Sequence, residues 1–366
     1  GAPTMQTAFR SDAGREDPQA LREVTAAAAA IFTEPPRRAA ALSYLKQRGI
    51  DAPGLGSEWV LGYAPPGWTR LVDRLHGSFS GQALLDAGVA RRSSRGALID
   101  AFRERVIFGL RDLDGTVAGF IARDLSGNPN TPKYFNTHQH ALFDKGRLLY
   151  GLHEGLNLST ASQPVIVEGP LDVLAIAARQ ATEASGGLLP VASSGTAFTT
   201  AQAQRVADVA TQRESSVLVA MDGDAAGRAA ALNAGERLRN AGLDIRIALL
   251  ANGSDPADYL ARPDATLDTF HAGNGLPLLS LQVENAIARQ GDAMQWPEGR
   301  LRALRSVAGH VATYPPDQAV RQIGWLAEAF HMHPSTVTLE LADAFALART
   351  VGSRHAASVA AAPITM

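Results

Sequence analysis

Cysteine is absent from all 366 residues of the chain. Its absence excludes disulfide bridges, thiolate zinc sites, iron–sulfur clusters and cysteine nucleophiles. No apolar run approaches the roughly 18 residues that a membrane-spanning helix needs. Residues 1–10 also lack the basic stretch followed by an apolar stretch that marks a secretory signal. We therefore expect a cytoplasmic protein with no membrane partner.

Lysine is scarce as well: only three of the 34 cationic residues are Lys. The formal net charge of −2 gives no sign of a nucleic-acid-binding protein, but net charge hides how charge is distributed. Residues 91–150 carry ten cationic and six acidic side chains, whereas residues 160–262 carry eight and eleven. A basic segment is therefore followed directly by an acidic one.

The apolar share of 46% is enough to build a core, and the length favours two or three domains. Asp17-Pro18 is typical of a helix start, and a second helix is expected from Pro36 to about residue 48. Residues 105–110 and 117–121 are strand-like runs around Asp114-Gly115, which predicts a hairpin. These patterns indicate a mixed α+β subdomain.

The pattern changes after residue 151 to short apolar runs that alternate with helical segments. Such alternation predicts a doubly wound parallel sheet with right-handed crossovers, so the overall fold class is α/β. The expected strands are residues 165–167, 190–192, 217–221 and 245–250, and the expected helices are residues 170–179, 199–210 and 225–240.

We divide the chain accordingly, with helices only over residues 275–345. The five predicted parts are an N-terminal tail with a linker helix (1–35), a basic α+β subdomain (36–158), the parallel α/β domain (159–265), a helical subdomain (266–345) and a flexible tail (346–366).

Acidic side chains follow the expected strands at their carboxyl ends. Glu168 comes after the first strand, and Asp222-Gly223-Asp224 comes after the third. Sites in open parallel sheets form at this edge, and carboxylate oxygens suit Mg²⁺. Asp172 and Asp255 are further candidate ligands. Any one of these residues alone is more often a helix cap or a turn former, but the joint pattern favours a metal site.

This constellation resembles the TOPRIM domain, in which a strand-end Glu and an Asp-x-Asp motif bind catalytic metal. Glu168, Asp222 and Asp224 match those positions. The motifs at residues 167–173, 191–196, 221–228 and 253–259 resemble the primase version of the domain. That version usually has Asp-Pro-Asp at the last site, whereas this chain has Asp255-Pro256-Ala257-Asp258, which leaves the role of Asp258 open.

Upstream motifs resemble the RNA polymerase core of bacterial replicative (DnaG-type) primases. They lie at residues 44–49, 61–65, 102–108, 132–136 and 143–151. Two departures are Ala101, where many relatives have Arg, and the absence of a Ser-Pro near His138. The resemblance implies a DNA-dependent RNA primase that makes short RNA primers by nucleotidyl transfer with two or more Mg²⁺ or Mn²⁺ ions.

The resemblance also implies roles for individual residues. Glu168, Asp222 and Asp224 are the expected catalytic residues, and Asp172 and Asp255 join them as metal ligands. The residues expected to bind nucleotide or template are Arg103, Arg105, Arg123, Lys133, Asn136, Lys145, Gly195, Thr196 and Arg228. The Tyr134 and Phe135 rings can stack on a base, but packing in the core is the favoured interpretation.

The implied partners are single-stranded DNA, ribonucleoside triphosphates and the RNA primer. Full-length relatives carry a zinc ribbon and a C-terminal helicase-binding domain. This chain has no Cys, so we expect no zinc here. Contacts with a replicative helicase or a single-strand binding protein would need those regions. We expect a monomer. The chain is either an excised polymerase core or a reduced primase, and both remain open.

Two other classes compete with the primase interpretation. One is a TOPRIM nuclease or topoisomerase, although none of the six tyrosines is an obvious topoisomerase nucleophile. The other is a non-catalytic DNA-binding protein similar to recombination mediators. The complete set of Glu and Asp-x-Asp residues argues against this second class.

Overall fold

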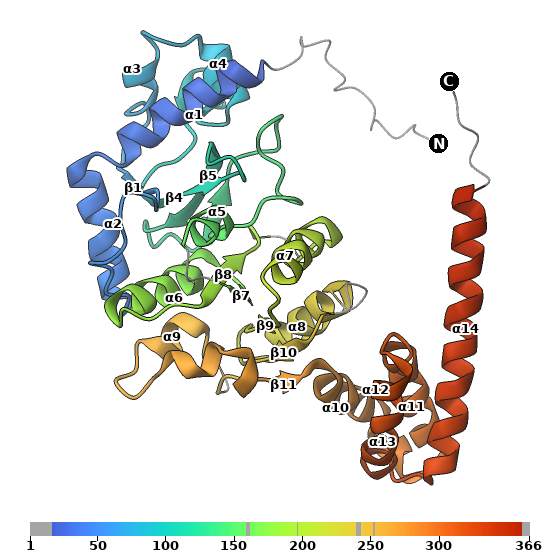
Figure 1. Cartoon of the computed structure of the whole chain (residues 1–366). Coiled ribbons are helices and arrows are strands. Elements are labelled where there is room, and N and C mark those ends of the chain that lie inside the picture. Colours follow the sequence, from blue (N-terminus) through green and yellow to red (C-terminus); the bar gives the residue numbers. More distant parts are fainter. Residues whose placement is uncertain (1–16, 159–161, 196, 239–242, 252, 361–366) are drawn as a thin grey trace. The chain divides into compact units, whose positions relative to one another are not determined.

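The computed structural model describes residues 17–158, 162–195, 197–238, 243–251 and 253–360, with side chains up to residue 350 (Figure 1). The chain divides into two compact units. The first comprises residues 1–161, 167–197 and 256–265, and the second comprises residues 162–166, 198–255 and 266–366. In the described part of the chain, no helix has the length and apolar character that crossing a membrane would require.

The first unit contains an antiparallel sheet in the order β1-β4-β5-β6. The strands of this sheet are β1 (Leu61–Ala64), β4 (Arg105–Arg111), β5 (Val117–Asp124) and β6 (Tyr134–Asn136). The first unit also contains β2 (Ala90–Arg92) and β3 (Leu98–Asp100), which pair only with each other, and β8 (Leu188–Ala192). Its helices are α1 (Pro18–Phe32), α2 (Pro35–Gln47), α3 (Val72–Leu75), α4 (Gly81–Asp86), α5 (Leu152–Leu156), α6 (Pro170–Thr182) and α9 (Pro256–Leu260).

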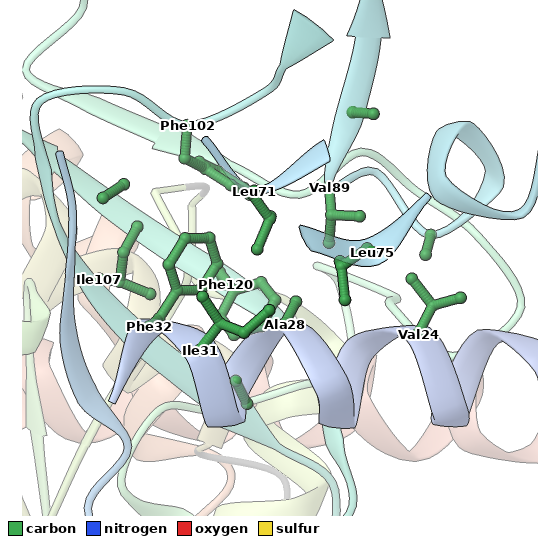
Figure 2. Close-up of a cluster of buried hydrophobic side chains, with 14 of the residues drawn as sticks. Val24, Ala28, Ile31, Phe32, Leu71, Leu75, Val89, Phe102, Ile107 and Phe120 are labelled. Carbon is green, nitrogen blue, oxygen red and sulfur yellow. The ribbon is translucent and has the colours of Figure 1, made fainter. Parts of the chain in front are cut away.

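Helix α1 covers this sheet and forms the core of the N-terminal part (Figure 2). It begins where the sequence predicts, because the side chain of Asp17 accepts the N–H of Gln19 at 3.0 Å and Pro18 occupies the first turn. Its apolar face brings Phe32 against Phe120 of β5, edge to face, with ring centroids 5.2 Å apart. The predicted hairpin is β4 and β5, paired with Phe108 opposite Ile121.

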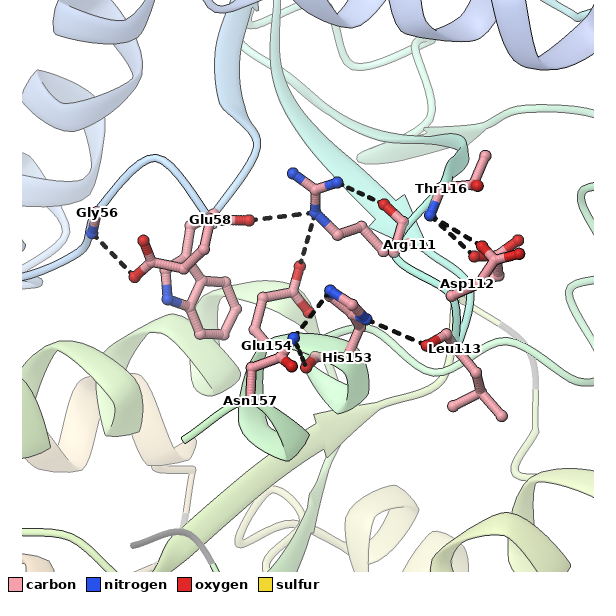
Figure 3. A network of polar contacts seen from close by, with 12 residues as sticks. Gly56, Glu58, Arg111, Asp112, Leu113, Thr116, His153, Glu154 and Asn157 are labelled. Atoms are coloured by element: carbon pink, nitrogen blue, oxygen red, sulfur yellow. Dashed lines mark hydrogen bonds and ion pairs between the residues drawn. The ribbon is translucent and has the colours of Figure 1, made fainter. Parts of the chain in front are cut away.

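A polar network lies beside the β4–β5 turn (Figure 3). The Arg111 guanidinium donates to the carbonyl of Gly115 at 2.6 Å and to that of Glu58 at 3.2 Å. Its Nε lies 3.8 Å from Oε1 of Glu154, whose side chain is buried. Burial raises the pKa of the Glu154 carboxyl to about 7, and the charge of Arg111 offsets only part of that effect.

In the second unit, β11 (Leu276–Pro277), β10, β9 and β7 lie side by side in that order, and all but β11 are parallel. Val165 of β7 (Gln163–Val167) pairs with Leu218 of β9 (Val217–Val219), and that residue pairs in turn with Arg246 of β10 (Ile245–Ile247), all in parallel. All three β9 side chains are buried, as expected for a strand covered on both faces. Helices α7 (Thr200–Gln212) and α8 (Ala225–Leu238) are the crossovers of this unit.

The rest of the second unit is mainly helical. Its core includes the fully buried Leu304, Leu326, Phe330 and Val337. The elements are η2 (Leu267–Phe270), η3 (Ala272–Asn274), β11 (Leu276–Pro277), α10 (Leu278–Gln290), η4 (Gly291–Gln295), α11 (Pro297–Val311), α12 (Pro316–Arg321), α13 (Ile323–Ala329) and α14 (Pro334–Ala360).

Two details of the C-terminal prediction are wrong. Residues 275–345 are not only helical, because β11 pairs antiparallel with β10, with Leu276 opposite Ile247. The sequence could not reveal a two-residue strand that depends on a partner about thirty residues away. Helix α14 also continues past residue 345 to Ala360, as the high helix propensity of its many alanines favours.

Candidate functional site

The Asp222-Gly223-Asp224 motif forms a tight turn between β9 and α8, in the second unit. A Cβ at Gly223 would lie 2.4 Å from the carbonyl oxygen of Ala251, and the Gly223 N–H donates to the carbonyl of Ser254 at 3.0 Å. A Cβ at Gly227 would lie 2.0 Å from the carbonyl oxygen of Asp222. Only glycine fits at either position, so the turn holds the two aspartates against the loop that follows β10.

Asp224 also caps helix α8. Its Oδ1 accepts the N–H of Gly227 at 2.8 Å, while the residue as a whole stays exposed. Asp222 is half-buried, as is Asp255, which follows β10 in the same unit. Hard divalent cations prefer carboxylate oxygens, so the donor chemistry of these three residues fits Mg²⁺ or Mn²⁺. Arg228 on α8 is exposed, and its Nη1 lies 3.4 Å from Oε2 of Glu284.

Glu168 and Asp172 belong to the first unit, at the start of α6. Glu168 follows β7 and is exposed. Asp172 is only 6% exposed. Its Oδ2 accepts the N–H of Gly169 at 3.2 Å, and its Oδ1 accepts the N–H of Ala257 at 3.1 Å. Asp172 therefore caps α6 and also holds the first turn of α9.

The predicted ligands are thus divided between the two units. Glu168 and Asp172 lie in the first, and Asp222, Asp224 and Asp255 lie in the second. Among the described residues, no three His, Asp or Glu side chains form a group that could hold a metal ion. Carboxylate oxygens suit a divalent cation by their chemistry, but the described residues do not gather into such a group, so the ligand set stays a prediction.

The cationic residues predicted to bind nucleic acid lie in several environments within the first unit. A cleft of about 560 Å³ is lined by Arg91, Arg103 and Arg105, together with Glu104 and Asp124. Burial lowers the pKa of the Arg103 and Arg105 guanidinium groups. Arg105 is 7% exposed and donates to the carbonyls of Ala122 and Pro132, both at 3.3 Å, so part of its hydrogen-bonding capacity supports the fold.

Three other cations lie outside the lining of that cleft. The Arg123 guanidinium lies 5.1 Å from the centroid of the Tyr134 ring. Burial raises the pKa of the Tyr134 hydroxyl to about 12, so this hydroxyl stays protonated at neutral pH. Lys133 is exposed and Lys145 is half-buried. The half-buried Tyr134 agrees with the favoured interpretation of this ring as a packed side chain, whereas Phe135, at 39% exposure, does not.

Asn136 and the loop after β8 come together in the first unit. The side-chain amide of Asn136 donates to the carbonyl of Ser194 at 2.6 Å, and Gly195 beside it has a φ of +73°. The Asn136 Oδ1 and the Ser194 Oγ are buried without a hydrogen-bond partner. A ligand or water molecule bound beside them would supply the missing hydrogen bonds. Thr196 lies outside the described residues.

Sequence reasoning missed two residues next to the cleft, Trp68 and Arg91. Arg91 lines the cleft, and the Trp68 ring lies 3.5 Å from the Arg103 guanidinium carbon. The signal for Trp68 was weak but present: it is one of only four tryptophans, and it follows Pro65-Pro66-Gly67. That turn-rich context is typical of an exposed loop.

Comparison with known proteins assigns both the N-terminal segment with the arginine-lined cleft and the following segment with the carboxylates to one family. A family model described as DNA primase catalytic core, N-terminal domain, matches residues 30–156, and a Toprim-like model matches residues 165–260. These matches define a TOPRIM protein with a primase-type N-terminal part. The chain belongs to the family of DnaG-type DNA primases and corresponds to their catalytic core.

Individual relatives agree with this assignment. The DNA primase of Escherichia coli is 36% identical over 293 residues, which cover 78% of this chain and 47% of that protein. A crystal structure of a DNA primase domain from Pseudomonas aeruginosa matches with a TM-score of 0.71 at 29% identity, covering 88% of this chain and 99% of that one. A DnaG primase catalytic domain bound to single-stranded DNA also has a TM-score of 0.71, at 28% identity and with coverages of 85% and 98%. The chain spans less than half the length of the E. coli relative.

Proposed function

We propose that this chain is the RNA polymerase core of a primase and synthesises short RNA primers on single-stranded DNA. One observation carries the proposal: the primase-core match covers the N-terminal segment with the arginine-lined cleft, and the Toprim-like match covers Glu168, Asp222 and Asp224. The first part offers cations for phosphates, and the second offers carboxylates for metal ions. Neither a nuclease nor a recombination mediator is among the relatives described above.

The carboxylates of Glu168, Asp222 and Asp224, joined by Asp255, are the proposed ligands of two or more Mg²⁺ or Mn²⁺ ions. Bound there, such ions supply charge neutralisation at phosphoryl oxygens and a lowered pKa for the attacking hydroxyl. Asp172 is the weakest member of the predicted set, since both of its oxygens accept backbone N–H groups. Its proposed contribution is therefore to position the start of α6, directly after Glu168.

The cationic residues are proposed to bind the template and the nucleotide. Arg103 and Arg105 in the cleft, together with Arg123, Lys133, Lys145 and Arg228, are the proposed contacts for phosphates of the template and the nucleotide. Arginine grips phosphate with two parallel N–H groups, whereas lysine offers a mobile point charge. Asn136, Gly195 and Thr196 are proposed to contact the nucleotide. The reaction then depends on positioning and charge stabilisation rather than on a covalent intermediate.

The proposed partners are a single-stranded DNA template, ribonucleoside triphosphates and the growing RNA primer. A solved relative bound to single-stranded DNA supports the first of these. We place this activity in the cytoplasm, where replicating bacterial DNA and nucleotides are available.

The experiment is one incubation of the chain with single-stranded DNA, Mg²⁺ and labelled ribonucleotides. The wild-type chain should yield RNA oligomers. Asp224→Asn should lose at least about 100-fold in rate, the scale of removing one charge-stabilising group. Asparagine is also a good N-cap, so α8 and the fold should remain intact. Asp208→Asn, an exposed carboxylate on α7, is the matched control and should keep the wild-type rate.

Other products would contradict the proposal in distinguishable ways. Shortened or relaxed DNA would indicate a nuclease or a topoisomerase. DNA binding without any product, at every divalent cation concentration tested, would indicate a non-catalytic binding protein.

A further inference from the structure

A cavity of about 460 Å³ lies within the second unit, between β10 and the segment of α11 and α12. Strand β11 ends at Pro277, opposite Arg246, so no strand continues on this side of Asp244 and Ile245 in the described part of the chain. The cavity lies in the space beyond this short strand. Its volume is typical of pockets that bind small molecules, and its lining includes none of the predicted metal ligands.

Two opposite charges stand side by side on the wall that β10 forms. The Arg246 Nε donates to both oxygens of the Asp244 carboxylate, at 2.9 and 3.1 Å, and the Ser216 hydroxyl donates to the same carboxylate at 3.0 Å. The two terminal nitrogens of Arg246 make no hydrogen bond among the described residues. The side chains of Asp244 and Arg246 remain 54% and 33% exposed. This wall therefore offers a carboxylate to a cationic group and a fork of N–H donors to an anionic one.

The end of α11 contributes a second polar pair to the lining. Nε2 of the buried His310 lies 3.1 Å from the Tyr314 hydroxyl. Burial raises the pKa of Tyr314, the charge of Asp244 raises it further, and the charge of Arg246 opposes them. The Tyr314 hydroxyl is therefore protonated at neutral pH, and it lies close enough to the charged pair to feel both members.

Much of the remaining lining is apolar. Ile245, Leu278 and Leu279 are buried in the wall, and the exposed Pro277 and Pro315 add further apolar surface. A ligand that fills the cavity thus needs an apolar body as well as two opposite charges close together.

We propose that this cavity binds a free α-amino acid with a large apolar side chain. The ammonium and the carboxylate of such a molecule are attached to one carbon, which matches the contact between Asp244 and Arg246. The ligand's carboxylate accepts from the terminal nitrogens of Arg246, its ammonium donates to Asp244, and its side chain packs on Leu278 and Leu279. The site goes beyond the proposed primer synthesis and does not depend on it.

The test is isothermal titration calorimetry of the whole chain with L-phenylalanine, without metal, nucleotides or DNA. Two probes each lack one charge: 3-phenylpropanoate lacks the ammonium, and 2-phenylethylamine lacks the carboxylate. L-Phenylalanine should bind at least about 10-fold more tightly than either, because a hydrogen bond between charged groups contributes about that factor. Free glycine has both charges but no apolar body, and it should also bind at least about 10-fold more weakly than L-phenylalanine.

Substitutions assign each charge to its partner. Arg246→Gln should bind L-phenylalanine no more tightly than 2-phenylethylamine, and Asp244→Asn should bind it no more tightly than 3-phenylpropanoate. Arg321→Gln is the matched control and should bind as wild type does. Arg321 lies 3.5 Å from Asp317 in an exposed pair on α12, outside the cavity lining.

Three results would overturn the inference. One is equal affinity of wild type and Arg246→Gln for L-phenylalanine. Another is a wild-type chain that binds L-phenylalanine no more tightly than the two single-charge probes, a comparison that needs no variant to fold. The third is absence of L-phenylalanine binding both by calorimetry and by ligand-observed NMR. Because no catalysis is measured, a failure of primer synthesis would contradict the proposed function alone.

Discussion

The Nε of Arg111 lies 3.8 Å from the buried Oε1 of Glu154, and this single cation does not keep the carboxyl acidic. Burial raises the pKa of Glu154 to about 7, from an ordinary value of 4.5. The folded chain therefore binds a proton here that the unfolded chain has already released. The contribution of Glu154 to stability therefore falls as the pH rises from about 4.5 to about 7, and it is lost above that range.

Glu154→Gln should remove this pH dependence, because the amide keeps the shape without the charge. We expect its free energy of unfolding to exceed that of wild type by up to about 3 kcal/mol at pH 8, and the two to be nearly equal at pH 4.5. Urea titrations at both pH values measure the difference. Glu236→Gln, an exposed carboxylate on α8, is the control. A stabilisation of the same size at both pH values would contradict the burial argument.

Asp172 should act as a structural cap. Asp172→Ala leaves the N–H groups of Gly169 and Ala257 without their acceptor in a buried place. Each such loss costs about 1–3 kcal/mol, so we expect a destabilisation of about 2–6 kcal/mol, measured by urea unfolding. Asp208→Ala on the surface of α7 should change little. Unchanged stability together with lost Mn²⁺ affinity would instead assign Asp172 to the metal.

Gly223 should not tolerate a side chain. The Cβ of Gly223→Ala would meet two backbone oxygens, those of Ala251 at 2.4 Å and Leu250 at 2.9 Å. The turn that carries Asp222 and Asp224 would have to move, so we expect primer synthesis to fall by at least about 10-fold. Gly309→Ala is the matched control. Gly309 lies within α11 with open space around it, and alanine there should raise stability by about 0.5–1 kcal/mol.

Lys133 tests the electrostatic part of template binding. It is exposed just before β6, so replacement by alanine should leave the fold intact. If it contacts one phosphate, Lys133→Ala should weaken binding to single-stranded DNA and lower the slope of log affinity against log salt by about 0.7. A salt titration measures both quantities. Unchanged affinity and slope, with unchanged nucleotide binding, would make Lys133 an ordinary solvated surface charge.

Local patterns in the sequence predicted the elements that depend on local chemistry. Asp17-Pro18 marked the start of α1, and the short apolar runs at residues 165–167 and 217–221 marked two parallel strands of the sheet, although the second strand ends at Val219. The placement of Glu168 and Asp222 at strand ends followed from those strands. The domain boundaries and the site residues remain predictions, since sequence pattern alone does not locate a metal or a nucleotide.

Long-range contacts limited what the sequence could predict about individual residues. Nothing near Asp172 indicates that the N–H of Ala257, 85 positions later, occupies one of its oxygens. The stack of Trp68 on Arg103 likewise joins a loop to a residue just before β4 begins. The burial that raises the pKa of Glu154 results from packing around α5. A single charged residue in a short helix does not reveal that packing from the sequence.

The hydrogen bond from Ala257 to Asp172 also constrains the order in which the chain can fold. The first unit is discontinuous: the chain leaves it at residue 197 and returns only at residue 256, where α9 begins. On the ribosome, helix α6 emerges well before α9, and until then one oxygen of Asp172 lacks the N–H that it accepts in the finished fold. The first unit therefore cannot be completed until residues 198–255 of the second unit have been synthesised, although its own last segment ends at residue 265, before the C-terminal helices of the second unit are made.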